Sequence, residues 1–251
     1  MKFTLPSCSQ FIKIRDGTEL RDAVIIPNFM QNQLEADPQS IWDTLRSLSK
    51  HNNGNPIPFK GRVKWLEGRH PTLNYRGHAI KRNKIWLQDE YAKGYLKYGY
   101  TGWQWLVAPA VRPISKVPEV EELMHNLNML GNFDFNHVIA TLYENGDDNI
   151  GPHSDKIKDF ANDSWFCVLK LGASRNFQFT DLAGNELYNE VLSAGAAIFV
   201  RANGENAANL IVKHAVPPMA DCGPSGSLTF RNITTVVPWA QVRKEVAKRS
   251  Q

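Results

Sequence analysis

Cysteine is scarce in this 251-residue chain. Its three cysteines, Cys8, Cys167 and Cys222, lie far apart and form no C-x-x-C pair. An odd number of widely spaced cysteines argues against a disulfide framework. We therefore expect a reducing, intracellular setting, either cytoplasmic or nuclear.

Long hydrophobic runs are also missing. No apolar stretch approaches the roughly 18 residues that a membrane-spanning helix needs. The opening segment, MKFTLPSCSQFIKIRDGTEL, lacks the apolar core of a secretory signal. The sequence therefore predicts no membrane partner, and no feature of it predicts a protein partner.

A strong excess of one charge is absent, since 29 Lys and Arg against 25 Asp and Glu give a net charge of +4. This mild basicity permits a polyanionic partner without requiring one. The basic clusters KRNK (81–84) and RKEVAKRS (243–250) are each more typical of solvated surface when taken alone. The segment at 91–105 mixes four Tyr and two Trp with Lys93 and Lys97, which suits base stacking beside phosphates and equally suits an aromatic minicore.

Repeats, low-complexity tracts and clear linkers are missing too, so we expect one integrated domain. The first half predicts a buried strand at 22–29 and helices at 37–51 and 117–130, with irregular strands and loops at 60–110. From 135 on, short apolar strands follow one another at close intervals. The predicted class is α+β, with a sandwich or barrel core over 135–251 and an N-terminal buttress over 1–134 that holds the helices.

One polar stretch, NGDDNIGPHSDK (145–156), carries His153 and Asp155 two residues apart. Side chains at that spacing on a strand share a face, so these two can bind one metal, although a loop with a surface histidine is the simpler alternative. His214, at the end of the later apolar stretch LIVKHAV, supplies a third candidate ligand. Two histidines and one carboxylate form the facial triad that leaves three positions open on Fe(II).

Arg231 lies inside the otherwise apolar segment SLTFRN. A buried guanidinium requires an anionic partner, because an unpaired buried charge is very costly. A dicarboxylate cosubstrate would supply such a partner.

Several segments together resemble the AlkB family of Fe(II)/2-oxoglutarate dioxygenases. The segment FNHVIATLYENGDDNIGPHSD resembles the approach to that family's iron ligands, LKLGASRNFQF its next strands, and SLTFR its closing motif. Upstream, AVIIPNF is similar to the family's entrance, and RHPTLNY and YGYTG to its nucleotide-recognition segments. The resemblance runs in order from about residue 22 to 234, and it is closest to the branch that acts on alkylated DNA or RNA bases.

The resemblance implies a double-stranded β-helix (jelly-roll) barrel with N-terminal helices and a nucleotide-recognition lid. It implies oxidation of a nucleobase in DNA or RNA, by hydroxylation or demethylation as in DNA repair, with molecular oxygen as co-reactant. The implied roles are iron binding by His153, Asp155 and His214; 2-oxoglutarate binding by Arg231, Thr229 and Tyr143; and substrate binding by Tyr98, Tyr100 and Arg175.

The chain departs from the family pattern around the cosubstrate. The family's closing motif reads Arg-x-Asn-x-Thr-x-Arg, but Ser225 and Ser227 stand here in place of its first arginine and its asparagine, and Thr141 replaces a second asparagine. Lys170 lies on a neighbouring predicted strand and should face opposite to Leu169 and Leu171. We hypothesise that its ammonium replaces the missing guanidinium, the alternative being that Lys170 points to solvent.

The substrate side departs as well, because Lys156 and Ile157 follow the H-x-D motif where the base-repair branch carries acidic residues. Three readings therefore stay open: a dioxygenase acting on a nucleobase, the same chemistry on a small molecule or protein side chain, and a catalytically silent binding module.

Overall fold

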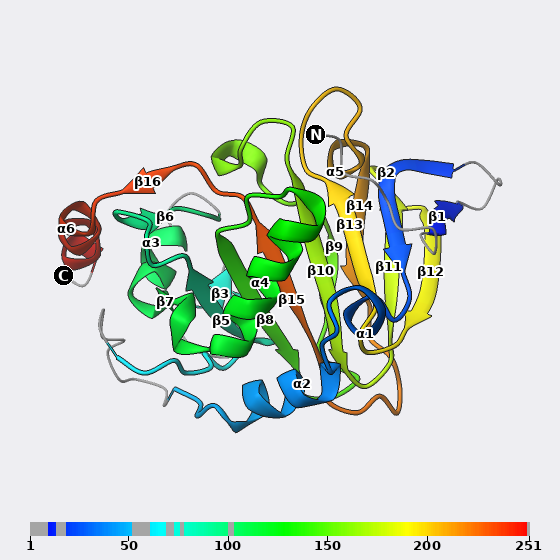
Figure 1. The fold of residues 1–251 in the computed structure, drawn as a ribbon, viewed down its shortest axis with the longest axis horizontal. Coiled ribbons are helices and arrows are strands. Elements are labelled where there is room, and N and C mark those ends of the chain that lie inside the picture. Colours follow the sequence, from blue (N-terminus) through cyan, green and yellow to red (C-terminus); the bar gives the residue numbers. More distant parts are fainter. Residues whose placement is uncertain are drawn as a thin grey trace.

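A large sheet and a smaller antiparallel sheet face each other in a mixed α+β fold (Figure 1). The structure, a computed structural model, describes residues 10–13, 19–51, 61–68, 73–75, 78–99 and 103–249. One core cluster contains Ile139 and Val168 from the large sheet together with Phe177 and Phe179 from the small one. The space between the sheets is therefore packed with side chains from both.

The large sheet has the strand order β1-β2-β13-β10-β15-β8-β5-β7, and its neighbours are antiparallel except for the β5–β7 pair. Its strands are β1 (Gln10–Lys13), β2 (Glu19–Ile26), β13 (Ala197–Arg201), β10 (Trp165–Gly172), β15 (Ser225–Arg231), β8 (His137–Tyr143), β5 (Asn83–Gln88) and β7 (Arg112–Pro113). The central strands β10, β15 and β8 lie side by side, and they carry most of the predicted cosubstrate residues.

The small sheet has the order β12-β11-β14-β9. Its strands are β12 (Glu186–Leu192), β11 (Arg175–Asp181), β14 (Val212–Val216) and β9 (Ile150–His153). Two short pairs complete the strands, namely β16 (Val236–Val237) with β6 (Tyr95–Leu96), and β3 (Asn74–Tyr75) with β4 (His78–Ala79).

The helices are α1 (Phe29–Gln33), α2 (Pro38–Ser47), α3 (Trp103–Val107), α4 (Pro118–Gly131), α5 (Ala208–Ile211) and α6 (Trp239–Arg249), with 3-10 turns at Ala108–Ala110, Ile114–Lys116 and Ile157–Asp159. Helix α2 begins where expected because the Asp37 carboxylate accepts the N–H groups of Gln39 and Ser40, and Pro38 occupies the first helical position. Helices α2 and α4 cover the outer face of the large sheet, as their shared core cluster and Figure 1 show.

Alternation along β10 separates the two faces of the large sheet. Cys167 and Leu169 pack outward beneath α2 and α4, whereas Phe166 and Val168 point inward to the small sheet. Lys170 shares the parity of the inward residues and is only 1% exposed. The side chain predicted to face opposite to its leucine neighbours therefore lies inside the fold, and the alternative of a solvent-facing Lys170 is wrong.

The outer face of β15 is shaped by Gly226. A Cβ atom there would come within 2.7 Å of the Trp42 ring of α2. The absence of a side chain lets the indole lie directly on the sheet.

The α+β class is confirmed, and two details of the predicted organisation are wrong. Helices are not confined to the N-terminal half, because α5 and α6 lie in the C-terminal half. The region 60–110 is not merely irregular, since β5 runs there with all six residues buried. Its residues alternate less clearly in hydrophobicity because both of its faces are covered. The division at residue 134 stays a prediction, and β5 and β8, from either side of it, are neighbours in one sheet.

Candidate metal and cosubstrate site

The pairing of β9 with β14 places His153 directly opposite His214. Their ring centroids lie 4.3 Å apart. Asp155 follows just beyond β9, where its main-chain N–H donates to Asn209 Oδ1 over 2.8 Å and its carbonyl accepts from Asn209 Nδ2 over 3.1 Å. One ligand atom from each of His153, Asp155 and His214 lies within 4.8 Å of the others, so the three can hold one metal ion.

The polar turn before β9 is built from its own side chains. Asn145 Oδ1 accepts the N–H groups of Asp147 and Asp148, and the Glu144 N–H donates to Asp148 Oδ2 over 2.7 Å. Arg175 lies beneath the turn and donates to several of its carbonyl groups, including that of Asn145 over 2.9 Å. Turn formers and acids precede His153 because they fold this tight connection between β8 and β9.

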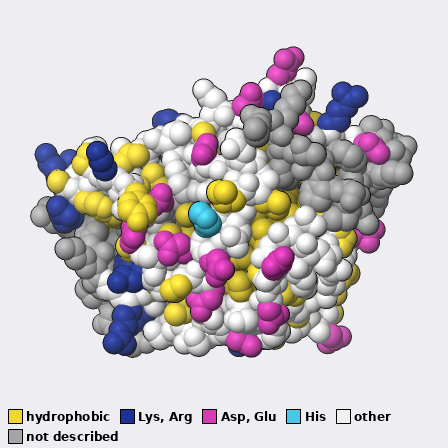
Figure 2. Space-filling model, in the orientation of Figure 1, with side chains coloured by type: hydrophobic (Ala, Val, Ile, Leu, Met, Phe, Trp, Pro, Cys, Tyr) yellow, Lys and Arg dark blue, Asp and Glu magenta, His cyan; other side chains and the backbone are white. Residues whose placement is uncertain are grey.

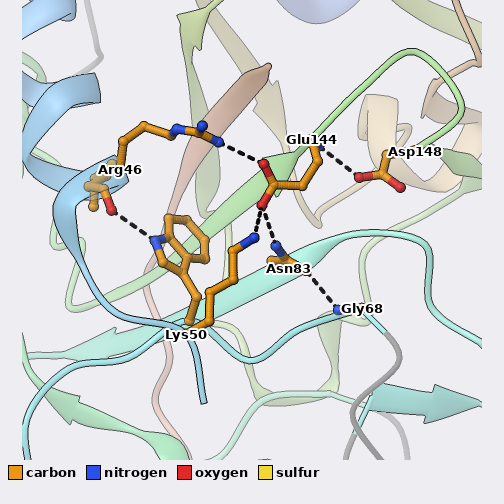
Figure 3. Close-up of polar contacts among 8 residues, drawn as sticks. Arg46, Lys50, Gly68, Asn83, Glu144 and Asp148 are labelled. Carbon is orange, nitrogen blue, oxygen red and sulfur yellow. Dashed lines mark hydrogen bonds and ion pairs between the residues drawn. The ribbon is translucent and has the colours of Figure 1, made fainter. Parts of the chain in front are cut away.

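A second polar network anchors the end of β8 next to that turn (Figure 3). The Glu144 carboxylate accepts from Arg46 over 2.7 Å and from Asn83 over 3.0 Å, and it pairs with Lys50 over 2.5 Å. These contacts connect α2, the segment after it and β5 to one carboxylate. Partial burial would raise the pKa of Glu144, but the hydrogen bonds and positive charges of Lys50 and Arg46 lower it.

The electrostatics of the three candidate ligands suit a divalent cation. Burial lowers the pKa of His153 to about 3, and the neighbouring His214 adds to this effect. Burial also lowers the pKa of His214. His153 Nδ1 lies 2.9 Å from the Gly151 carbonyl, which can only accept, so Nδ1 carries the proton and Nε2 is left as the ligand atom. Neutral imidazoles are the form that binds a metal.

Asp155 is held ionised by Arg231. Burial alone would raise the pKa of Asp155, but Arg231, with its Nε 2.9 Å from Oδ2, holds it well below the usual range. The Arg231 guanidinium also lies 4.5 Å above the Tyr98 ring centroid. Its partner in the structure is thus a candidate metal ligand of the protein itself. Pairing of Arg231 with a cosubstrate carboxylate stays a prediction.

Four polar side chains form one row across the inner face of the large sheet. The register pairs Lys84 with Thr141, Thr141 with Ser227, and Ser227 with Lys170. Adjacent strands are about 4.8 Å apart, so the two lysines close the ends of a row about 14 Å long. Lys84 Nζ donates to Thr141 Oγ1 over 2.9 Å, and Lys170 Nζ donates to the Gly226 carbonyl over 3.3 Å.

Both ammonium groups are buried without a carboxylate partner among the described residues. Burial, with Arg175 nearby, lowers the pKa of Lys170 to about 8, and burial together with Arg82 and Arg231 lowers that of Lys84. Ser225, fully buried on the same face, has a hydroxyl with no hydrogen-bond partner in the described part of the structure. Unpaired cations beside an unsatisfied hydroxyl fit a ligand that carries oxygen anions.

A solved structure resembles this chain in the arrangement of its strands and helices. The solved structure of OsALKBH1, an AlkB homologue, matches with a TM-score of 0.50 and 12% sequence identity, over 89% of this chain and 99% of that chain. The chain has an AlkB-like fold. No protein-family model matches the sequence, and no curated protein sequence matches it. Within the part of the chain that the structure describes, no helix is long and apolar enough to cross a membrane.

The remaining predicted site residues occupy different parts of this AlkB-like fold. Thr229 and Tyr143 lie on the inner face, and Tyr143 pairs across strands with Ser225. Tyr98 is buried beneath Arg231, and Tyr100 lies outside the described residues. Arg175, expected at the mouth of the site, is fully buried and supports the turn before β9. A contact of Arg175 with substrate stays a prediction.

The aromatic segment at 91–105 contributes mainly to the core. Tyr95 and Tyr98 are buried, and Trp105 and Trp239 lie 6.4 and 6.0 Å from the Tyr95 ring. Tyr91, in contrast, is 82% exposed. The minicore alternative therefore holds for Tyr95, Tyr98 and Trp105, while Tyr91 stays available to a partner.

Sequence reasoning missed two polar residues of the inner face, Lys84 and His137. The sequence placed Lys84 in a surface cluster, but in the AlkB-like fold it is buried near the start of β5. Alternation with Trp86 and Gln88 was the available signal. His137 is buried opposite Arg231 with an unpartnered Nδ1, and burial lowers its pKa to about 3. A histidine that opens an apolar strand gave no distinctive pattern.

Proposed function

We propose that this protein is an Fe(II)- and 2-oxoglutarate-dependent dioxygenase that oxidises a nucleobase in DNA or RNA. The observation that carries the proposal is the group of His153, Asp155 and His214, with ligand atoms within 4.8 Å, on a fold of AlkB type. In this proposal the two sheets form the double-stranded β-helix barrel of the family, and the segment around Tyr98 and Tyr100 belongs to its substrate lid.

The three ligands would hold Fe(II) and leave three coordination positions open. The bound iron, 2-oxoglutarate and oxygen supply one reaction, in which a substrate C–H becomes C–OH while 2-oxoglutarate becomes succinate and carbon dioxide. Where that carbon is an N-methyl group, the hydroxymethyl product releases formaldehyde and leaves the bare base. Arg231 holds Asp155 ionised and oriented, which keeps the ligand set intact.

Within the same proposal Lys170, Arg231, Thr229 and Tyr143 bind 2-oxoglutarate. Ser225 and Ser227 have no charge with which to hold a distant carboxylate, and Lys170 faces Ser227 across the sheet. Its ammonium is buried and has no carboxylate partner among the described residues. This supports the proposal that Lys170 on β10 replaces the arginine that the AlkB motif carries at the position of Ser225 on β15.

Anaerobic titration of the Fe(II)-loaded protein with 2-oxoglutarate tests this proposal, because the chelate gives a visible charge-transfer band. We expect a saturable band in the wild type. In Lys170→Met the affinity should fall at least about thirtyfold, since truncating one partner of a buried charge pair costs about 2 kcal/mol or more. Lys244→Met, at an exposed position on α6, is the matched control and should titrate like the wild type.

A charge-swap pair gives the sharper comparison. Lys170→Ser should weaken binding, and Lys170→Ser combined with Ser225→Arg should restore part of it by returning the guanidinium to β15. Unchanged binding in both Lys170 variants would exclude the relocated cation. Iron binding without any band in the wild type would instead favour a silent module.

The nucleobase itself is tested by incubating the enzyme with methylated DNA and RNA oligonucleotides and measuring formaldehyde and repaired base. Lys156 and Ile157 favour a second candidate, oxidation of a small molecule or a protein side chain. Lys156 is exposed beside the candidate metal site, and neither side chain can accept a hydrogen bond from a base. A normal charge-transfer band without any turnover or binding of oligonucleotides would point to that candidate.

A further inference from the structure

A pocket outside the candidate site lies between β5, β7, the turn Ile114–Lys116 and α6. Its volume is about 660 Å³. Its lining includes neither the three candidate metal ligands nor Lys170 or Arg231. Val111, Pro113, Ala92 and Trp239 provide apolar surface, and the exposed cations Arg62, Lys116 and Arg243 line it together.

Each of these three cations follows a residue that the fold holds in place. Arg62 follows Gly61, whose carbonyl accepts from Arg112 Nε over 3.0 Å. Lys116 follows Ser115, whose hydroxyl donates to Glu90 over 2.6 Å. The residue before the third cation is held by packing.

That third cation, Arg243, follows Val242, which is fully buried where α6 packs on the body of the protein. Trp239 begins the same helix and packs on Tyr95 with ring centroids 6.0 Å apart. Three segments far apart in the sequence thus bring their charges to one pocket.

We infer that this pocket binds a nucleotide of a single-stranded nucleic acid, away from the nucleotide that enters the candidate site. This rests on the proposed nucleic-acid substrate. Arg62, Lys116 and Arg243 would attract the phosphates, and the apolar wall with Trp239 would pack against a base. Arg112 holds the pocket together through its bonds to the Gly61, Pro109 and Val111 carbonyls.

The charge distribution favours an extended polyanion at this edge. Among the described lining residues, Glu90 alone is acidic, and its carboxylate accepts a hydrogen bond from Ser115. Figure 2 shows Lys and Arg side chains gathered at the side of the molecule that carries α6, and acidic ones over the middle of the same face. Repulsion by the acidic area would keep a nucleic-acid strand on the basic edge.

The shape of the pocket favours a nucleotide over a flat anionic surface. Sites for small molecules commonly measure about 300–1,000 Å³, and this pocket lies within that range at about 660 Å³. A membrane surface would contact only the three exposed cations and leave the apolar wall unused. Acidic peptides would lack a flat ring to pack against Trp239.

The test compares two triple variants of the full-length protein that lose the same charge. The pocket variant carries Arg62→Gln, Lys116→Gln and Arg243→Gln. The control carries Lys64→Gln, Lys244→Gln and Arg21→Gln, at exposed positions that do not line the pocket. Binding of fluorescein-labelled oligothymidylate and oligouridylate is measured by anisotropy over a salt series, with polyglutamate as competitor.

We expect the pocket variant to bind at least about tenfold more weakly than the control. Its slope of log affinity against log salt should be smaller by about 2, because each lost phosphate contact to a single strand removes about 0.7. Equal weakening of both variants would overturn the inference, since it would reduce the effect to net charge. Competition by polyglutamate as effective as that by unlabelled oligonucleotide would overturn it in favour of an acidic peptide.

Failure of this inference can be told apart from failure of the proposed function. Normal oligonucleotide binding by the pocket variant overturns the pocket alone. Absence of binding by the wild type overturns the pocket and the nucleic-acid substrate together. The iron and 2-oxoglutarate titration, which needs no oligonucleotide, reports separately on the dioxygenase proposal.

Discussion

Charge is buried in two places between the sheets, and the two places differ in how that charge is compensated. Near the candidate metal ligands, Arg231 Nε and Asp155 Oδ2 are 2.9 Å apart, so each ion neutralises the other. In the row that ends in Lys84 and Lys170, the hydrogen-bond partners are the neutral oxygens of Thr141 and Gly226. The first place is compensated within the protein, whereas the second is expected to gain stability if the proposed anionic cosubstrate binds.

The difference in energetic cost separates an ion pair that the protein compensates itself from two buried lysines that have only neutral hydrogen-bond partners. Two buried lysine side chains without a carboxylate partner in the described part of the chain oppose folding when they are charged, and burial lowers the pKa of both. The Ser225 hydroxyl on the same inner face has no hydrogen-bond partner among the described residues, which supports the proposal that an anion binds there. Removing a charge should lower the free energy of unfolding at the first place and raise it at the second, and variants at each place test this.

The largest effect is expected from Asp155→Asn. It leaves Arg231 buried without an ion partner, which should lower the free energy of unfolding by about 3–5 kcal/mol. It should also abolish tight binding of Fe(II) or Co(II), because one of three ligands loses its charge. Urea denaturation and metal titration measure the two effects. The control Asp163→Asn removes a 72% exposed partner of Arg201 and should cost less than about 1 kcal/mol. Equal losses in both variants would contradict the pairing.

Lys170→Met should act in the opposite direction on the protein without cosubstrate. Replacing a buried, unpaired ammonium with an apolar side chain of similar length should raise the free energy of unfolding by about 1–3 kcal/mol. Thermal unfolding with and without 2-oxoglutarate shows the consequence. The ligand should raise the midpoint of the wild type and leave that of Lys170→Met nearly unchanged. Destabilisation by Lys170→Met in the absence of ligand would show that the ammonium is compensated within the protein.

The affinity for 2-oxoglutarate should depend on pH through Lys170. Burial lowers the pKa of Lys170 to about 8, so the ammonium that attracts a carboxylate is present below that pH and is lost as the pH rises through it. The dissociation constant should therefore increase between neutral and alkaline pH, by at most about tenfold per pH unit. Titrations in a pH series measure this. Lys170→Arg, which stays charged, should flatten the dependence; a wild type with the same flat profile would rule out Lys170 as the titrating group.

The smallest effect is expected at the half-exposed network around Glu144 (Figure 3). Glu144→Gln should lower the free energy of unfolding by about 0.5–1 kcal/mol at neutral pH, as for other partly exposed ion pairs. The pKa of Glu144 is lower in the folded protein than in the unfolded chain. The stabilisation is therefore fully present at a pH above the unfolded-state pKa, and it is lost as the pH falls through the folded-state pKa. Urea denaturation of wild type and variant should therefore converge in acid. A difference that persists in acid would indicate a packing effect instead.

Much of the secondary structure was predictable from local pattern. The Asp37-Pro38 start of α2 and the apolar spacing of α4 are signals within a few residues of the chain, and both helices formed there. The parity of Lys170 between Leu169 and Leu171 was also sufficient to predict its face. Lys84 was mistaken for a surface residue because KRNK reads as a charged cluster, and only its neighbours in space bury it.

Residue types and their spacing along the chain were enough to predict the candidate ligand set, and the resemblance to the AlkB motif was enough to predict that Ser225 stands in place of an arginine. His153 and Asp155 are two residues apart, and Ser225 stands in a recognisable motif. Tertiary structure alone decided that Asp155 is the partner of Arg231, that Arg175 supports a turn, and that Lys84 and Lys170 end one row. Each of these depends on strand register and sheet order, which bring together residues 30 to 86 positions apart in the sequence.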